Sequence, residues 1–297
     1  MIAQRTITSN NAREIVRVGL ELSKPRVTLL LVFTAFAAAV VAARGAPDPA
    51  RVALLLAAGI AACAGAAWIN HYLDRDIDAR MARTRLRPLP SGRANPVAVV
   101  WIGIALIATG VRIALFVNPT VAWFVLFGAL CYVTVYTAWL KRRTAWNIVI
   151  GGAAGSFAAL AGWATAQPAL SPSAGLLALL LFLWTPPHFW SLAMVYGEEY
   201  RRAGVPALPV IVGARKCAWV ILGHAVAIVI ASLFLIGSGA TRGWVYPGVV
   251  TVAGASFVLA AIRLVYDPRP RQAWKTYKVS SVYLGVLLLA MMLDAIL

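Results

Sequence analysis

Long apolar runs, separated by short polar stretches, follow one another along the chain from about residue 20. Each run has the roughly 20 residues that an α-helix needs to cross the hydrocarbon core of a bilayer. None shows the alternation of polar and apolar residues that is typical of a membrane barrel strand, so helices are the expected spanning elements. The pattern predicts nine transmembrane helices, near residues 20–43, 51–73, 97–117, 119–139, 146–166, 173–196, 217–237, 245–265 and 277–296.

The fold class that this pattern predicts is all-α, a polytopic membrane bundle. A cytoplasmic tail over residues 1–19 is expected to precede a single transmembrane domain over residues 20–297. Composition supports a lipid environment, because 61% of the residues are hydrophobic and only 12% are charged, too few to cover a water-exposed surface. The three cysteines lie far apart without CxxC spacing, which argues against a disulfide framework or a zinc site.

The net charge of +17 indicates nucleic-acid binding only if it forms a soluble basic face. Here the basic residues lie in short loops between apolar runs, so no nucleic-acid partner is expected. With the N-terminus in the cytoplasm, only Arg44, Arg51, Arg112 and Arg242 of the 27 Lys and Arg residues lie toward the outer side. The positive-inside rule therefore favours this orientation. The expected location is the cell inner or plasma membrane, with the mitochondrial inner membrane as the weaker alternative.

The ten acidic residues are distributed unevenly, and half of them lie in two short stretches. Asp74, Asp76 and Asp78 follow the second predicted span, and Glu198 and Glu199 follow the sixth. Both stretches are cytoplasmic in this topology, so two distant parts of the sequence can meet at one membrane depth. The distribution predicts one site built from both clusters.

The spacing of the first cluster suits a metal ion. In a helix, positions i, i+4 and i+8 turn by only about 40° per step, so Asn70, Asp74 and Asp78 share one face. Neighbouring carboxylates at the edge of a low-dielectric region repel one another unless a divalent cation supplies the missing charge. Mg2+ fits, because it binds through a few carboxylates together with substrate phosphates and water. The alternative is a set of solvated loop carboxylates.

Asp76 points away from this face and is expected to pair at the surface with Arg75 or Arg80. Other basic residues follow the first cluster directly or lie on the next cytoplasmic loop, where they can bind a diphosphate and stabilise it as a leaving group. We expect catalytic roles for Arg83, Arg87 and Lys141, and substrate contacts for Arg80, Arg142 and Arg143. The alternative for each is topological, since arginines of inner loops need no catalytic role.

Over about residues 23–294 the chain resembles the intramembrane aromatic prenyltransferases. The resemblance rests on the Asn-x3-Asp-x3-Asp pattern of Asn70, Asp74 and Asp78, and on four longer words in the same order and spacing. These words are NHYLDRDIDARMARTRLRPLPSG, YTAWLKRRTAWNIVIGGAAG, LFLWTPPHFWSLAM and EEYRRAGVPALPVIVG. Within the family they are most similar to the branch that farnesylates haem.

The resemblance implies a nine-helix bundle around a central cavity, with two acidic motifs that hold Mg2+ and a diphosphate. The implied reaction joins the farnesyl group of farnesyl diphosphate to a vinyl carbon of haem B, with addition of water. The product, haem O, serves haem–copper oxidase assembly, so contact with oxidase-assembly proteins or haem A synthase is expected. The implied metal ligands are Asn70, Asp74, Asp78, Glu198 and Glu199, with Tyr200 as a substrate contact. The family usually has Asp-Tyr where this chain has Glu199–Tyr200, which keeps the carboxylate on a longer side chain.

Ionisation of an allylic diphosphate leaves a carbocation, which needs a dry pocket and can be shielded by aromatic faces. The candidates for this role are Trp146, Trp184, Phe189 and Trp190. Their alternative is ordinary packing or lipid contact. His188 is a candidate ligand of the haem iron, and its alternative is a hydrogen bond to a neighbouring helix. Pro186 and Pro187 predict a local break in the sixth helix.

Two other classes of function remain open. One is a different intramembrane prenyltransferase, acting on a quinone precursor or chlorophyllide, because the acidic stretches alone cannot separate these acceptors. The other is a transporter, although transporters more often show charges or broken helices at mid-membrane than paired acids at one mouth. Acceptor competition distinguishes the enzymes, and an uptake assay in proteoliposomes tests the transporter.

Overall fold

The structure is a computed structural model that describes residues 12–241 and 243–297. These residues form helices and connecting turns, without a strand. Within them, nine helical segments are long and apolar enough to cross a membrane. They are α2 (Pro25–Ala42), α3 (Pro49–Leu73), α5 (Pro96–Leu115), α6 with η1 and η2 (Pro119–Leu130, Cys131–Trp139 and Leu140–Arg142), α7 with α8 (Asn147–Gly151 and Ala153–Ala166), α9 (Pro172–Val195), α12 (Ala214–Gly237), α13 (Val245–Tyr266) and α14 (Pro270–Ile296).

The predicted all-α bundle with nine spans is confirmed, and most boundaries agree to within three residues. The first and last spans differ. The first begins at Pro25 because Lys24 adopts a left-handed backbone (φ 47°) and separates α2 from a short preceding helix, α1 (Ala12–Leu22). The last begins at Pro270 instead of residue 277. The first turns of α14 are helical, but their polar residues hid them from a prediction based on apolar runs. Of the predicted tail, residues 1–11 lie outside the described part, and residues 12–19 belong to α1.

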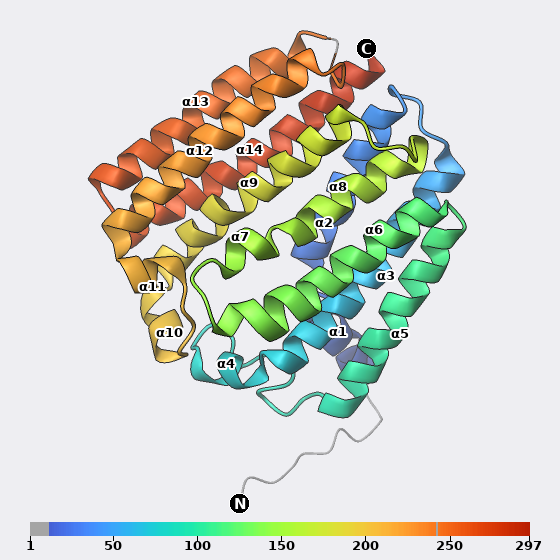
Figure 1. The fold of residues 1–297 in the computed structure, drawn as a ribbon. Coiled ribbons are helices and arrows are strands. Elements are labelled where there is room, and N and C mark those ends of the chain that lie inside the picture. Colours follow the sequence, from blue (N-terminus) through green and yellow to red (C-terminus); the bar gives the residue numbers. More distant parts are fainter. Residues whose placement is uncertain (1–11, 242) are drawn as a thin grey trace, which may run out of the picture.

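The spans lie side by side in one bundle (Figure 1). α2 packs against α3, α8 and α14, and α9 packs against α8, α12 and α14. Two helix pairs approach closely because one partner has no side chain at the contact. A Cβ atom on Gly162 of α8 would lie 2.0 Å from the carbonyl oxygen of Ala35 in α2, and one on Gly65 of α3 would lie 2.5 Å from that of Gly103 in α5.

Short helices gather at one end of the bundle, where α4 (Arg75–Arg80) follows α3 and α10 (Gly197–Arg202) follows α9 (Figure 1). α11 (Leu208–Val212) continues from α10. A small apolar cluster joins the two loops. It contains Ile77, Met81, Ala203 and Val205, with Tyr200 packed against them. The segments that carry the two acidic clusters are therefore in contact.

Two helices depart from the simple pattern. The prediction that Pro186 and Pro187 break the sixth span is wrong, because α9 runs without interruption from Pro172 to Val195. Both prolines are buried among neighbouring helices, a setting in which a membrane helix tolerates missing amide donors. The fourth span, by contrast, changes from α-helix to a nine-residue π-helix, η1, whose wider turns are frequent at functional sites.

Candidate active site

Asn70, Asp74 and Asp78 share one face, as their spacing predicts. α3 ends at Leu73 and α4 starts at Arg75, but the helical hydrogen bonds continue across the junction. The amide of Asp74 donates to the carbonyl of Asn70 at 2.9 Å, and the amide of Asp78 donates to that of Asp74 at 2.8 Å. All three side chains are buried, with exposed fractions of 2–3%. We call Asn70, Asp74 and Asp78 the acidic face.

Each residue of the acidic face is paired with a cation from another part of the chain. Lys141, just after η1, donates to Oδ2 of Asp74 at 2.5 Å. The guanidinium of Arg87 donates to both carboxylate oxygens of Asp78, at 2.8 and 2.9 Å. Lys24, just before α2, donates to Oδ1 of Asn70. Buried carboxylates need such partners, because an unpaired charge in a low-dielectric region is costly.

Lys24 belongs to the site, although in the sequence it stood out only as one of the basic residues that set the membrane orientation. Its Nζ also donates to the hydroxyl of Tyr132 at 3.2 Å, and burial together with the nearby Arg87 lowers the pKa of Lys24 to about 7. Thr137 was also missed: its hydroxyl accepts from Nδ2 of Asn70 at 3.0 Å. Both Tyr132 and Thr137 belong to the π-helix η1. No local sequence pattern pairs residues on such distant helices.

The acidic face fits a divalent cation in one specific respect. Oδ1 of Asp74 is buried and has no hydrogen-bond partner. A buried carboxylate oxygen left without a donor is suited to a metal ion, and the neighbouring oxygens of Asn70 and Asp78 are the ligand type that Mg2+ prefers. Among the described residues, no group of three or more His, Cys, Asp and Glu side chains converges on one point. Glu198 and Glu199 therefore do not form one metal-binding cluster with Asp74 and Asp78.

The second acidic cluster lies on α10 and touches the first loop through the backbone. Oε2 of Glu199 accepts a hydrogen bond from the amide of Arg83 at 3.3 Å. The guanidinium of Arg83 lies 5.2 Å from the ring centroid of Tyr196, at the end of α9. Glu198 faces outward, with a side chain that is 58% exposed and paired with Arg201 and Arg202 on its own helix.

Asp76 is exposed, as predicted, but its expected partner was wrong. It pairs with Arg142, which donates at 2.6 and 2.7 Å, and this contact holds the pKa of Asp76 at about 2. Arg142 reaches it because the fourth span ends beside α4, whereas Arg75 turns back onto Tyr72, donating to its carbonyl at 2.7 Å and covering its ring. Arg142 thus binds at the surface rather than at the acidic face. Arg80 and Arg143 are exposed at the same end of the bundle.

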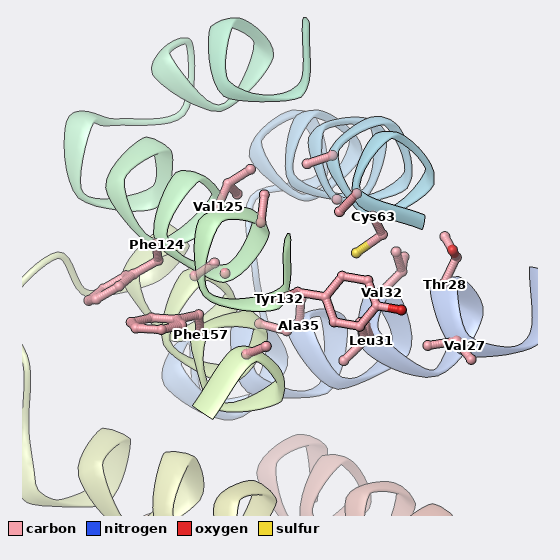
Figure 2. Close-up of a pocket in the computed structure, with 18 of the residues that line it drawn as sticks. Val27, Thr28, Leu31, Val32, Ala35, Cys63, Phe124, Val125, Tyr132 and Phe157 are labelled. Atoms are coloured by element: carbon pink, nitrogen blue, oxygen red, sulfur yellow. The ribbon is translucent and has the colours of Figure 1, made fainter. Parts of the chain in front are cut away.

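An apolar cavity extends from this site into the bundle between α2, α3, α6 and α8 (Figure 2). Lys24 and Tyr132 line its polar end, and Ala35 and Leu55 line its deep end. The α2 backbone rises ~16 Å between Lys24 and Ala35 at 1.5 Å per residue. Most of the wall is made of small side chains, among them Ala62, Ala66, Ala129, Ala154, Ala158 and Ala161. Phe124 and Phe157 pack against each other on the opposite side from Cys63 (Figure 2).

The aromatic candidates are distributed over different surroundings. Trp190 is buried in the core, edge-on to His224 of α12, and Trp146 is 55% exposed near the start of α7. Trp184 stacks on His188 with ring centroids 4.2 Å apart, and Phe189 meets the same imidazole edge-on. Only these last two, with His188, form one group on α9. None of the four lines the apolar cavity.

The fold and the acidic face define an intramembrane prenyl-transferring class of protein, and comparison with known families agrees. The model of the UbiA prenyltransferase family matches residues 31–282, and the chain belongs to this family. Its relatives include the protoheme IX farnesyltransferase of Symbiobacterium thermophilum, 45% identical over 284 residues, which cover 95% of each chain. Protoheme IX farnesyltransferase 1 of Cenarchaeum symbiosum is 44% identical over 290 residues and 96% of each chain.

Solved structures have the same fold at low sequence identity. One, described as digeranylgeranylglyceryl phosphate synthase in membranes, superposes with a TM-score of 0.79 and 21% identity over 95% of this chain and 98% of that one. A UbiA homologue of Archaeoglobus fulgidus bound to DMAPP and Mg2+ gives a TM-score of 0.66 and 16% identity, over 92% of this chain and 98% of the other. At these identities the likeness establishes the fold alone.

Proposed function

We propose that the protein transfers the farnesyl group of farnesyl diphosphate to a vinyl group of haem B, with addition of water, and releases haem O and diphosphate. The observation that carries this proposal is the acidic face: buried carboxylates, each with a cation beside it, at the polar end of an apolar cavity. Relatives with 42–45% identity over nearly the whole chain, named as protoheme IX farnesyltransferases, support haem as the acceptor.

The acidic face would hold Mg2+ through the side chains of Asn70, Asp74 and Asp78, and the bound ion would neutralise charge on the diphosphate. Lys24, Lys141 and Arg87 already lie within hydrogen-bonding distance of these residues. With a cation held by the carboxylate oxygens, the same ammonium and guanidinium groups would be positioned to donate to diphosphate oxygens. Donors fixed beside a departing anion stabilise it at no reorganisation cost, which lowers the barrier to ionisation.

The apolar cavity is the proposed site of the farnesyl chain. It starts beside Lys24 and Tyr132, so the diphosphate lies at its mouth while the hydrocarbon extends towards Ala35. The walls carry few polar groups, which keeps water away from the allylic cation and prevents its premature hydrolysis. Glu199 is tied to the loop of Arg83, so the second cluster closes the same end of the bundle.

The relatives' names favour haem over a quinone precursor or chlorophyllide. The decisive experiment incubates purified protein with haem B, farnesyl diphosphate and Mg2+ and measures haem O by mass spectrometry. Matched reactions replace haem B by a quinone precursor, replace Mg2+ by EDTA, or supply geranylgeranyl diphosphate. Formation of haem O only in the complete reaction supports the proposal. Prenylation of the quinone precursor with no haem O would overturn it.

Contact with oxidase-assembly proteins or haem A synthase is proposed as the route by which the product leaves.

We also propose that the end of the bundle with α4 and α10 faces the cytoplasm of a cell inner or plasma membrane. The basic residues of these loops are the reason. A cysteine introduced at exposed Ser91, after α4, is expected to resist a membrane-impermeant maleimide added to intact cells. A cysteine at exposed Ala46, between α2 and α3, should react. External labelling at position 91 with protection at position 46 would reverse the orientation.

A further inference from the structure

His188 lies in α9 within a row of aromatic rings shared with α14. The indole of Trp184 stacks on its imidazole with centroids 4.2 Å apart and an interplanar angle of 25°, and the ring of Tyr277 lies 4.4 Å away at 33°. Trp274 continues the row by stacking on Tyr277 at 5.1 Å, and Phe189 meets the imidazole edge-on at 5.6 Å. Ring contacts from two helices therefore hold the imidazole in place.

A hydrogen bond links the imidazole of His188 to Ser280 of α14. Nδ1 of the imidazole is 2.8 Å from the Ser280 hydroxyl oxygen. When that hydroxyl donates its single proton to the carbonyl of Tyr277, also at 2.8 Å, it accepts from the imidazole. Nδ1 is then the protonated nitrogen, and Nε2 presents a lone pair. The indole of Trp184 donates to the carbonyl of Ser280 at 2.8 Å, which fixes the same turn of α14.

Nε2 of His188 has no hydrogen-bond partner among the described residues, yet it is not sealed in the core. It differs in this from the indole nitrogen of Trp190, two residues along, which is unpaired and fully buried. His188 retains 9% of its surface. A histidine that merely bridges helices should have both nitrogens satisfied. A neutral imidazole with one nitrogen donating to a fixed acceptor and the other free is the arrangement found in metal-binding histidines.

The surroundings of this imidazole suit a flat macrocycle with acidic edges. Phe189, which contacts the imidazole, is 36% exposed, and Trp274, on the far side of Tyr277, is 38% exposed. Nζ of Lys278 lies 5.6 Å from the Trp274 ring centroid, on the first turns of α14. Lys275 is exposed on the same turns, and neither lysine forms an ion pair with a described residue. Such cations match carboxylate substituents at the rim of the macrocycle.

We propose that Nε2 of His188 is an axial ligand of the iron of the haem acceptor, and that Ser280 is the positioning residue that sets the required tautomer. The inference rests on the proposed function, because it assigns the docking site of the second substrate. It places haem against α9 and α14. The farnesyl cavity is formed by α2, α3, α6 and α8, and the diphosphate site lies at its mouth with α4 and η2, so the two substrates are held by different sets of helices.

The test is a haem titration of full-length protein, purified in detergent without a histidine tag and followed by the Soret band. His188→Ala should weaken haem affinity by at least about tenfold and abolish the Soret shift, and added imidazole should restore that shift. Metal-free protoporphyrin IX should bind parent and variant equally. The matched control is His224→Ala, a partly buried histidine of α12 bonded to its own helix, which should behave like the parent.

Two further variants separate ligation from packing. His188→Gln keeps an amide donor for Ser280 but has no iron ligand, so thermal stability should stay near that of the parent while the Soret shift is lost. Ser280→Ala should lower haem affinity about tenfold by releasing the tautomer, and Ser280→Thr, which keeps the hydroxyl, should recover most of it. The inference is overturned if haem affinity and spectrum are unchanged in His188→Ala, or if haem and metal-free porphyrin lose affinity equally.

Measuring haem O alongside separates this inference from the proposed function. If haem binds through His188 but no haem O forms, His188 as the iron ligand is supported and the proposed reaction is rejected. If haem O forms but the Soret band does not depend on His188, the proposed reaction is supported and His188 as the iron ligand is rejected.

Discussion

The two acidic clusters consist of the same chemical groups in opposite surroundings. Asp74 and Asp78 are 2–3% exposed, and their cations come from residues 67 and 9 positions away, across the site. Glu198 is 58% exposed at its side chain and pairs with arginines three and four positions along the same short helix. Exposed i, i+3 and i, i+4 pairs contribute little to stability, whereas a buried carboxylate depends on its partner.

This difference separates two roles. A buried carboxylate with one unpaired oxygen, such as Asp74, is poised for a cation, while an exposed glutamate with local partners is adequately solvated without one. Glu199 is intermediate, because it is partly buried and tied to the loop of Arg83. The first cluster is therefore expected to carry most of the metal-dependent activity, and the second to adjust it.

The largest expected effect is loss of charge on the acidic face. Asp78→Asn should reduce haem O formation about a thousandfold, since it removes a proposed metal ligand and the carboxylate that positions Arg87. The amide keeps the size of the side chain, so the protein should remain folded. Turnover at saturating Mg2+ and the thermal unfolding midpoint are the measurements. Activity within tenfold of the parent would show that the acidic face does not bind the essential metal.

Removal of a cation should have the next largest effect. Lys141→Met leaves the Asp74 carboxylate buried and uncompensated, at a cost of about 3–5 kcal/mol in unfolding free energy. Turnover should fall about a hundredfold. The double variant Lys141→Met/Asp74→Asn should recover stability without recovering activity. Recovery of neither would indicate that Lys141 contributes through packing.

The second cluster is expected to show a smaller, graded response. Glu199→Gln should lower turnover about tenfold, because it weakens the link between α10 and the loop of Arg83. Glu198→Gln is the matched control one residue away and should stay within about twofold. Both are measured as haem O formed against Mg2+ concentration. Equal losses at the two positions would contradict the distinction drawn from their burial.

The smallest effect is expected at Asp76. Asp76→Asn should leave turnover within about twofold at neutral pH, because this carboxylate pairs with Arg142 at the surface. Its pKa is depressed from 3.8 to about 2, so any stabilisation by the pair is complete above pH 3.8 and lost as the pH falls through about 2. Unfolding midpoints of parent and variant should therefore converge at pH 2. A turnover loss as large as that of Asp78→Asn would refute the assignment by helical face.

The parts of the molecule that were predictable from sequence are those governed by local rules. Span length follows from bilayer thickness, and the shared face of Asn70, Asp74 and Asp78 follows from helical periodicity. Contacts between distant helices were not predictable. Lys24 and Asn70 are 46 residues apart, and Asp76 and Arg142 are 66 apart. The partner of Asp76 was consequently wrong.

Local rules also fail where the helix itself changes. Tyr132 and Thr137 lie in the π-helix η1, whose side chains do not follow the 3.6-residue period. The contacts of Tyr132 with Lys24 and of Thr137 with Asn70 therefore cannot be predicted from helical periodicity. In α9 the sequence suggested a break at Pro186 and Pro187, but tertiary packing preserved the helix. Global context decided both cases.

The alanine-rich wall of the cavity has a consequence for substrate choice. Methyl groups make no directional contact, so in the proposed function such a wall would select a substrate mainly by the length of its hydrocarbon chain. If the cavity holds the farnesyl chain as proposed, replacing a deep alanine by a larger residue is expected to shorten the isoprenoid that fits and to leave the phosphate chemistry at the mouth unchanged. Chain length and reactivity are then separately adjustable properties of one protein.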